Sequence, residues 1–550
     1  MTPLDHLPVL VVLLPALTAV ALLFIGDAGA DVHGGHGQAR LKWSRRVSLA
    51  SVGLFALLAA LLVARVADGS LLVYRLGEWP APFGIALVVD RLGAMMVALT
   101  AAVALPVLLY ASGGWDSHGR HFHPMFQFQL MGLAGAFVTG DLFNLFVFFE
   151  VLLIASYVLM LHGQGRERFK AGLHYVVLNL AASALFLVGV ALLYAMTGTL
   201  NLADLALRVP QLQGSEAALA QAGALVLLVV FGFKAALAPL AVWLPATYAA
   251  TSAPVAALFA IMTKVGVYAL LRVHGVVFGD GGAGAAAEPW ILPLALATSV
   301  VGVMGALAAR TLPRLVAWLT VASVGTVLAG IGLFSTAAWA AALYYLLNST
   351  LVVAGLFLLG EIVAAQRGDA ADHLVPGPAV GQPVLLGLAM LLAAASAAGL
   401  PPLPGFIGKV AVLQGVAGHA AGPAVWAVVL VVGFLSLLAL TRAGIVLFWQ
   451  AQPGAVTSAA PAAGRRPPAA VAGLLAGTLL LLGATVLLAV AAAPVMRYTA
   501  AAAIQLADTA AYARAVLAEQ GGGRAVTTRP YTGERAAPPA AAQPASGASR

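Results

Sequence analysis

The sequence contains no cysteine among its 550 residues. This absence excludes disulfide bonds, cysteine-ligated iron–sulfur clusters and zinc–thiolate sites. The sequence also lacks a phosphate-binding P-loop, a dinucleotide-binding fingerprint and any cluster of metal ligands at a recognised spacing. We therefore expect a protein that uses no cofactor and no metal.

Charged residues are scarce as well. They make up 9% of the chain, whereas a soluble domain contains about 25%, and hydrophobic residues make up 62%. This composition predicts an all-α polytopic membrane protein that lies in a lipid bilayer. The net charge of +8 does not indicate a nucleic-acid partner, because lysine and arginine occur in short loops between apolar segments.

About fourteen apolar segments are long enough to cross a bilayer as helices. The first of them lacks the features of a cleaved signal peptide, so we expect it to be retained. The expected limits are 7–26, 47–67, 92–112, 124–140, 142–162, 172–196, 217–244, 253–276, 289–309, 314–334, 336–364, 383–415, 422–449 and 469–496.

Four regions outside these spans have patterns of their own. Val73 to Gly93 combines β-branched residues with Gly and Pro and predicts a small extracytoplasmic hairpin. Thr199 to Val209 predicts a short interfacial helix capped by Thr199 or Asn201. The C-terminal part predicts one short helix over Thr499 to Glu519 and a disordered tail from Gly521.

Basic residues are concentrated in the loops that follow odd-numbered spans. The positive-inside rule places these loops in the cytoplasm and both termini outside it. The residues concerned are Arg40, Lys42, Arg45, Arg46, Arg166, Arg168, Lys170, Arg310, Arg314, Arg465 and Arg466.

Two lysines lie in the apolar stretch from Phe231 to Arg272, in which Pro245 and Pro254 flank a polar turn. Lys234 precedes the turn and Lys264 follows it, each by a similar number of residues. A rise of 1.5 Å per residue places each ammonium about 16 Å from the surface, near the middle of the bilayer. A cation at that depth is costly unless it is paired, hydrated or deprotonated.

Both long breaks in the apolar pattern lie beside a lysine. Pro239 follows Lys234 in the seventh span, and the prolines of GLPPLPGFIGKV, Gly399 to Val410, precede Lys409 in the twelfth. An odd offset between the breaks inverts the second unit, so spans four to eight and nine to thirteen are predicted to be inverted repeats, each with one discontinuous helix. The expected regions are 1–123, 124–276, 289–449, 469–497 and 498–550.

Glu150 is the one carboxylate within the fifth span, about 13 Å deep when counted from Asp141. Our hypothesis is that Glu150 pairs with Lys234 and tunes its affinity for protons; the alternative is a charge that only holds helices together. Burial disfavours the charged ammonium, so Lys234, Lys264 and Lys409 can form a proton relay, which arginine cannot do. The alternative for each lysine is snorkelling to the interface.

Other polar residues in the spans are weaker candidates. His174 and Asn179 either lengthen the relay or form a hydrogen-bonded helix contact. Asn348, Ser349 and Thr350 either hold water between Lys264 and Lys409 or bond across helices. The residues expected to cap the polar turn between Pro245 and Pro254 are Tyr248, Thr251 and Ser252. The residues near span ends that are expected to be solvated or to snorkel are His274, Glu361 and Arg442.

These motifs resemble the proton-translocating antiporter-like membrane subunits. This group includes the D-type subunit of the multi-subunit (Mrp/Pha-type) cation/proton antiporters and the corresponding subunits of respiratory complex I. The resemblance covers about residues 70–450 and rests on the Glu150 helix, the segment FGFKAALAPLAVWLPATYAATSAPVAALFAIMTKVGVYAL and the segment GLPPLPGFIGK. It implies a bacterial inner-membrane protein with about fourteen helices, and it implies that Glu150, Lys234, Lys264 and Lys409 match the charged residues of the family.

The resemblance implies a subunit of a hetero-oligomeric antiporter, with other subunits, protons and Na+ or K+ as its partners. The alternatives are a proton-pumping subunit of a quinone-linked or hydrogenase complex and a scaffold that moves no ions. Four residues depart from the family pattern. Ala241 and Asn348 stand where histidine is frequent, Pro404 where serine is frequent and Val353 where lysine is frequent.

Overall fold

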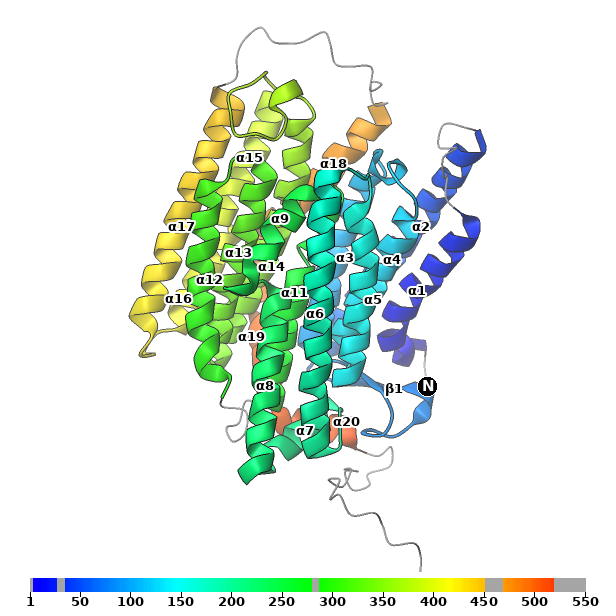
Figure 1. Ribbon diagram of the computed structural model, residues 1–550, viewed down its shortest axis with the longest axis vertical. Helices are drawn as coiled ribbons and strands as arrows, with labels where there is room; N and C mark the ends of the chain where they lie inside the picture. The colour runs from blue at the N-terminus through cyan, green and yellow to red at the C-terminus, as the bar shows by residue number, and fades with distance from the viewer. Residues whose placement is uncertain (1–2, 27–34, 279–285, 451–467, 519–550) are drawn as a thin grey trace, which may run out of the picture.

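The computed structural model describes residues 3–26, 35–278, 286–450 and 468–518. Long helices run roughly side by side and form one bundle (Figure 1). A two-stranded hairpin and the short helices α7 (Leu202–Arg208) and α20 (Thr509–Leu517) lie at one end of this bundle. Its composition and helix lengths make the chain a multi-pass membrane protein.

The remaining helices form the body of the bundle. In chain order they are α1 (Leu7–Ile25), α2 (Gly35–Val66), α3 (Arg91–Ala111), α4 (Phe122–Val138), α5 (Leu142–Leu161), α6 (Arg166–Thr197), α8 (Gly214–Ala235), α9 (Trp243–Ala250), α10 (Ala253–Phe259), α11 (Met262–Arg272), α12 (Glu288–Ala308), α13 (Leu312–Ile331), α14 (Thr336–Ala364), α15 (Pro383–Ala398), α16 (Pro404–Gly415), α17 (Gly422–Gly444), α18 (Pro468–Val490) and α19 (Ala492–Ala507).

Within the described residues, twelve helical segments are long and apolar enough to cross a membrane. Two of the expected spans are not among them. The fourth corresponds to α4, which has 17 residues, and the twelfth is divided between α15 and α16, which have 16 and 12 residues. A total of about fourteen crossings therefore stays a prediction.

The seventh span is discontinuous, as its proline predicts. Helix α8 ends at Ala235, and Ala236 adopts a left-handed conformation with φ of 62°. The chain then passes through Pro239 and the 3-10 helix η6 (Leu240–Val242) into α9. Proline cannot donate a backbone hydrogen bond, so the helix does not continue through this position.

The twelfth span is broken in the same way. Helix α15 ends before Gly399, which has a φ of 90°, and α16 begins at Pro404. Gly399 tolerates the left-handed conformation because it has no Cβ, and proline suits the first turn of the new helix. The predicted discontinuity between Gly399 and Val410 is confirmed.

The eighth span, expected over 253–276, is one of these twelve segments and runs over Ala253–Val277, but it is interrupted within its length. Helix α10 ends at Phe259, α11 starts at Met262, and a π-helical turn, η7 (Val273–Val277), follows α11. The interruption falls at Ala260 and Ile261. Neither residue is a Gly or a Pro, so the sequence contains no local signal for the interruption.

The hairpin and the short helix α7 agree with the sequence. Strands β1 (Leu72–Arg75) and β2 (Ala86–Val89) pair antiparallel, with Leu72 opposite Val89. Asn201 caps α7, because its side chain accepts hydrogen bonds from the backbone N–H groups of Ala203 and Asp204.

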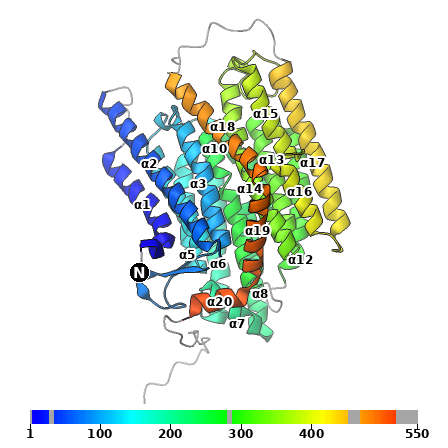
Figure 2. The same ribbon diagram turned by 180° about the vertical axis from the view of Figure 1, so that it is seen from behind.

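The C-terminal region differs from the expected arrangement of one span to residue 496 and one short helix. Helix α18 ends at Val490, α19 follows directly, and Asp508 caps α20 through the Ala511 N–H. Figure 2 shows α19 beside α14, and α20 lies against α7. The predicted tail from residue 521 lies outside the described residues.

The core of the bundle is centred on α14. This helix is buried along most of its length and packs against α10, α13, α15, α16, α18 and α19. Because α10 and α16 both contact it, α14 connects the two regions that contain discontinuous helices.

Candidate functional site

Lys234 lies in the last turn of α8, directly before the break, and only 6% of the residue is exposed. Its Nζ donates a hydrogen bond of 2.9 Å to Oδ1 of Asn179 on α6. The rings of Phe149 and Phe233 lie with their centroids 6.0 Å from the same nitrogen. The ammonium is thus held inside the bundle by one neutral amide and two aromatic faces, and it does not snorkel to an interface.

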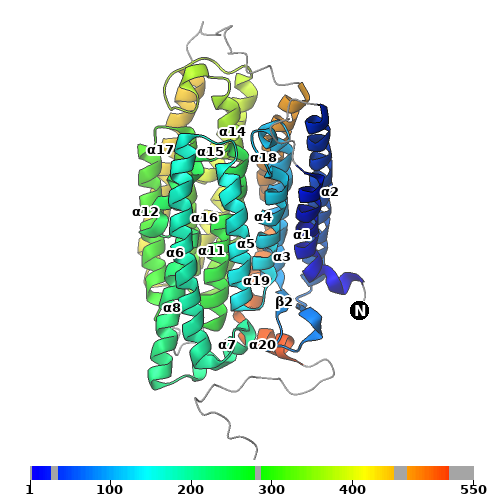
Figure 3. The ribbon, with the colours of Figure 1, turned by 45° about the vertical axis from the view of Figure 1, so that its right-hand side comes forward.

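Glu150 lies on α5, which packs against α6 as α6 packs against α8 (Figure 3). Ser183 Oγ donates a hydrogen bond to Oε1 of Glu150. Among the ion pairs of the described residues, none joins Glu150 to Lys234. The expected pairing is therefore not a direct one, because side chains of α6 give each charge a neutral partner.

Lys264 is fully buried on the first turn of α11. Its Nζ donates to Thr263 Oγ1 over 3.2 Å, and no acidic partner for it occurs in the described part of the chain. Helix α11 lies close to α8 because Gly266 has no side chain; a Cβ there would come within 2.7 Å of the Lys234 carbonyl carbon. The helices that carry Lys234 and Lys264 therefore pack backbone to backbone.

Lys409 binds backbone carbonyls at the break in the twelfth span. Its Nζ donates to the carbonyl oxygens of Ala398 and Ala397, over 2.6 and 3.3 Å. These carbonyls belong to the last turn of α15, where the helix ends and cannot bond them itself. The C-terminal end of a helix also carries partial negative charge, which favours a cation. Lys409 is 8% exposed, so it too is buried and does not snorkel.

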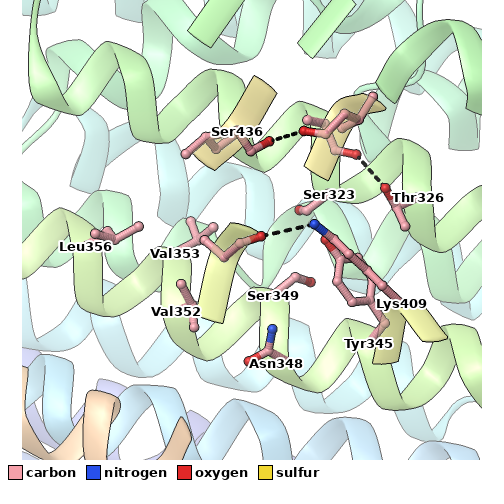
Figure 4. Close-up of a pocket in the computed structure, with 14 residues that line it drawn as sticks. Ser323, Thr326, Tyr345, Asn348, Ser349, Val352, Val353, Leu356, Lys409 and Ser436 are labelled. Carbon is pink, nitrogen blue, oxygen red and sulfur yellow. Dashed lines mark hydrogen bonds between the residues drawn. The ribbon is translucent and has the colours of Figure 1, made fainter. Parts of the chain in front are cut away.

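A small enclosed cavity of about 20 Å³ adjoins Lys409. Figure 4 shows the amino group of Lys409 directed toward the polar side chains that line this cavity. A volume of this size accommodates about one water molecule if polar partners are present. The polar residues that line the cavity are Ser323, Thr326, Tyr345, Asn348, Ser349, Lys409 and Ser436.

The polar patch on α14 hydrogen-bonds across helices, and a role in holding water stays a prediction. Asn348 accepts a hydrogen bond of 2.8 Å from Ser396 on α15, and both Asn348 and Ser349 line the cavity. Ser349 and Thr350 both donate to the Leu346 carbonyl of their own helix. Val353, one of the four residues that depart from the expected family pattern, also lines the cavity with an apolar side chain.

A second, open cavity of about 710 Å³ reaches the broken seventh span from the surface. It is lined by charged and titratable residues of α6, α13 and the segment after α14, and by Trp243 and Thr247 of α9. The Trp243 indole donates to the Phe233 carbonyl over 3.1 Å, one residue before Lys234. His174 lies at this cavity, exposed and bonded to Lys170 of its own helix, so it extends no buried relay.

The residues of the polar turn between Pro245 and Pro254 do not cap it as expected. Tyr248 donates to the Phe259 carbonyl over 2.7 Å and so connects α9 to α10. The hydroxyls of Thr251 and Ser252 are buried and have no hydrogen-bond partner among the described residues.

The three residues near span ends have different environments. Arg442 is exposed and donates to the Leu307 carbonyl over 3.2 Å, whereas Glu361 is half-buried and accepts from the Trp115 indole. The expectation for His274 is wrong, since the residue is 1% exposed and neither ring nitrogen has a partner in the described ranges. It lies in the π-helical turn that carries it into the protein interior.

Sequence reasoning missed a buried ion pair between Asp90 and Arg272. The guanidinium donates to both carboxylate oxygens over 2.7 and 2.8 Å, and its Nε donates to the Tyr268 hydroxyl over 3.2 Å. One signal was present, because Lys264, Tyr268 and Arg272 follow at a spacing that places them on one face of α11.

The donor set does not provide a metal site in the described residues, where no group of three or more histidine or acidic side chains could hold an ion. What the site does contain is a series of buried amines and one carboxylate with neutral partners. Such groups can bind and release protons inside a membrane, where each change of charge is costly.

Comparison with known proteins agrees with this geometry. Residues 139–438 match the family described as NADH:quinone oxidoreductase/Mrp antiporter, TM. The chain belongs to this family. It is 42% identical to the D-type subunit of a probable K(+)/H(+) antiporter of Rhizobium meliloti, over 82% of this chain and 88% of that protein. It is also 36% identical to the D-type subunit of a Na(+)/H(+) antiporter of Bacillus subtilis, over 81% of this chain and 87% of that one.

A solved structure of the Mrp complex from Dietzia sp. DQ12-45-1b also contains a similar chain. The TM-score is 0.80 at 28% identity, and the match covers 94% of this chain and 100% of that chain. Glu150, Lys234, Lys264 and Lys409 all lie inside the region that matches the NADH:quinone oxidoreductase/Mrp antiporter family.

Proposed function

We propose that this chain is a membrane subunit of a hetero-oligomeric antiporter that exchanges a monovalent cation, Na+ or K+, for protons. One observation carries the proposal: Lys234 is buried beside a helix break with a neutral partner, and Glu150 lies on a neighbouring helix. Relatives named as D-type antiporter subunits support exchange over redox-linked proton pumping. The chain acts as part of a transporter and not as an enzyme.

The proton relay consists of Glu150, Lys234, Lys264 and Lys409. Protons reach Lys234 from the open cavity that ends at Trp243 and Thr247. The close packing of α8 and α11 couples Lys234 to Lys264, and the small cavity beside Lys409 supplies a site for a connecting water. Lysine suits this role because its ammonium can lose a proton when it is desolvated.

The placement in the membrane follows from the distribution of basic residues. The protein lies in the bacterial inner membrane, with both termini extracytoplasmic and about fourteen crossings. The regions 124–276 and 289–449 form inverted repeats, and the breaks after Ala235 and Ala398 support this arrangement because each lies beside a buried lysine.

Exchange measured in vesicles that contain the assembled complex tests the function. Addition of Na+, K+ or Li+ is expected to release protons, followed by a pH-sensitive dye, and the response identifies the cation. Glu150→Ala, Lys234→Ala and Lys409→Ala should each abolish the signal while assembly continues. Lys42→Ala, which changes an exposed lysine, is the matched control. Normal exchange per assembled complex in all three variants would leave only a scaffold role.

A further inference from the structure

Helix α6 carries a buried polar stripe that the relay does not yet include. Tyr175, Asn179 and Ser183 follow one another at intervals of four residues and are 1%, 1% and 7% exposed. This spacing places all three on one face of the helix. Most other residues of α6 are apolar, and many of them are exposed on its outer face, so the stripe is a distinct inner surface.

The orientation of the Asn179 amide is fixed by two hydrogen bonds. Its Nδ2 donates to the Tyr175 carbonyl over 2.8 Å, and its Oδ1 accepts from Lys234 Nζ over 2.9 Å. A carbonyl only accepts and an ammonium only donates, so the reversed amide would satisfy neither bond. The amide oxygen of Asn179 therefore faces Lys234, and the amide nitrogen faces the Tyr175 carbonyl.

Ser183 makes the equivalent contact with Glu150. Its hydroxyl donates to Oε1 of the carboxylate. Glu150 and Lys234 are therefore each hydrogen-bonded to the same helix, at positions one turn apart, and not to each other.

We propose that Asn179 and Ser183 are positioning residues that hold Lys234 and Glu150 in separate neutral hydrogen bonds and so set the pH range of exchange. This inference rests on the proposed function. An ammonium that contacts a carboxylate holds its proton more tightly than one that contacts an amide oxygen. Because Asn179 and Ser183 are neutral and keep the two charges apart, Lys234 can release its proton, and the charge of Glu150 still affects the ammonium from a distance.

Other titratable groups lie on the helices packed around Lys234. On α6, Glu167, Lys170 and His174 line the open cavity that reaches the break. Tyr157 on α5 and Tyr248 on α9 are neutral phenols, and Tyr175 on α6 bonds to Ser156 over 2.9 Å. On α11, Lys264 lies in the first turn, and Arg272 in the last turn is paired with Asp90. An ammonium or a guanidinium only donates hydrogen bonds, so neither Lys264 nor Arg272 can replace Asn179 as the acceptor for Lys234.

The test is the pH dependence of cation-driven proton exchange in vesicles that contain the full complex. Asn179→Leu removes the acceptor of the ammonium, so half-maximal exchange should move about one unit to lower pH. Asn179→Asp places a carboxylate against the ammonium, so the midpoint should move by a similar amount to higher pH. Thr197→Val, which removes a buried hydroxyl at the far end of α6 that bonds to Leu193 and Thr199, is the control and should leave the midpoint unchanged.

Ser183 supplies a second test that does not depend on the fate of Asn179. Ser183→Ala should reduce exchange several-fold, and Ser183→Thr, which keeps the hydroxyl, should restore it. Assembled variants with an unshifted pH midpoint and normal exchange would overturn the inference, as would equal shifts of the same sign for Asn179→Leu and Asn179→Asp. A wild-type complex with no exchange would instead refute the proposed function.

Discussion

Arg272 on α11 donates hydrogen bonds to both carboxylate oxygens of Asp90, the residue that caps α3. Both side chains are buried, and the rings of Tyr268 and Tyr512 lie 5.2 and 5.8 Å from the guanidinium carbon. Burial alone would raise the pKa of Asp90, but the Arg272 charge and hydrogen bonds hold it below its ordinary value. The pair therefore stays ionised and fixes the end of the helix that carries Lys264.

Removal of one member of this pair should be strongly destabilising. Asp90→Ala leaves the Arg272 charge buried without a partner, a situation that costs about 3–5 kcal/mol. We expect a lower thermal midpoint of the purified complex and a lower assembled amount. The double variant Asp90→Ala with Arg272→Met removes both charges and should recover much of the loss. A double variant no more stable than the single one would contradict the role of the pair.

We expect the stability of the folded protein to depend on pH through Asp141. Burial raises the pKa of this α5 cap to about 6 from an ordinary value of 3.8, although the Asn144 N–H opposes the shift. A raised pKa means that the folded state binds the proton more tightly. The stabilising contribution is therefore complete below about pH 4 and is lost as the pH rises through about 6.

Asp141→Asn keeps an N-capping side chain but cannot ionise. The variant should match the wild type near pH 4 and be more stable at pH 8, by at most about 3 kcal/mol for a shift of this size. Thermal unfolding of the solubilised complex across this pH range provides the measurement. Asp508→Asn, at the exposed cap of α20, is the control and should change the pH dependence little.

The breaks in the fold show what the sequence could predict. Pro239 and the prolines before Lys409 cannot continue a helix, so both discontinuities could be predicted from residue type alone. The interruption at Ala260 and Ile261 could not, because helix formers occupy it and the packing of α10 against α14 and of α11 against α8 decides it. Propensity is a weak guide where tertiary contacts compete with it.

The site was predictable in its charges but not in their partners. Depth in an apolar span identified Lys234 as buried, whereas Glu150, which the same argument placed inside the membrane, is only partly buried in the structure. Their neutral partners on α6 depend on how three helices face one another, which the sequence does not specify. Asp90 and Arg272 are 182 residues apart, so no local pattern joins them.

Gly266 allows close packing between α8 and α11, the helices that carry Lys234 and Lys264. A Cβ at this position would lie 2.4 Å from the Ala235 nitrogen, which is backbone and cannot move aside. Gly266→Ala should separate α11 from α8, destabilise the protein by about 1–3 kcal/mol or more and reduce exchange. Gly444→Ala is the matched control, because nothing lies within 4 Å of its added Cβ. Equal thermal midpoints and exchange rates for the two variants would show that the contact is not required.

The cavity beside Lys409 predicts a difference between two neighbouring residues of α14. Both hydroxyls donate to the Leu346 carbonyl of their own helix, but Ser349 lines the cavity and Thr350 does not. Ser349→Val should fill the space, displace a water and reduce exchange several-fold. Thr350→Val removes a hydroxyl of the same kind and should retain most of the activity. If both variants exchange cations at the wild-type rate, the cavity is not part of the proton route.

Lys234→Arg tests whether the residue must lose its proton or must only be positive. Arginine keeps the charge and can donate to Asn179, but its guanidinium stays protonated under all conditions of the assay. If Lys234 only held helices together, this variant would retain exchange. Because the relay requires release of the proton, we expect a fall of about a hundredfold or more at every pH, a loss typical of removing a proton-transfer group. The variant should still assemble with its partner subunits, which separates a missing proton step from a missing complex.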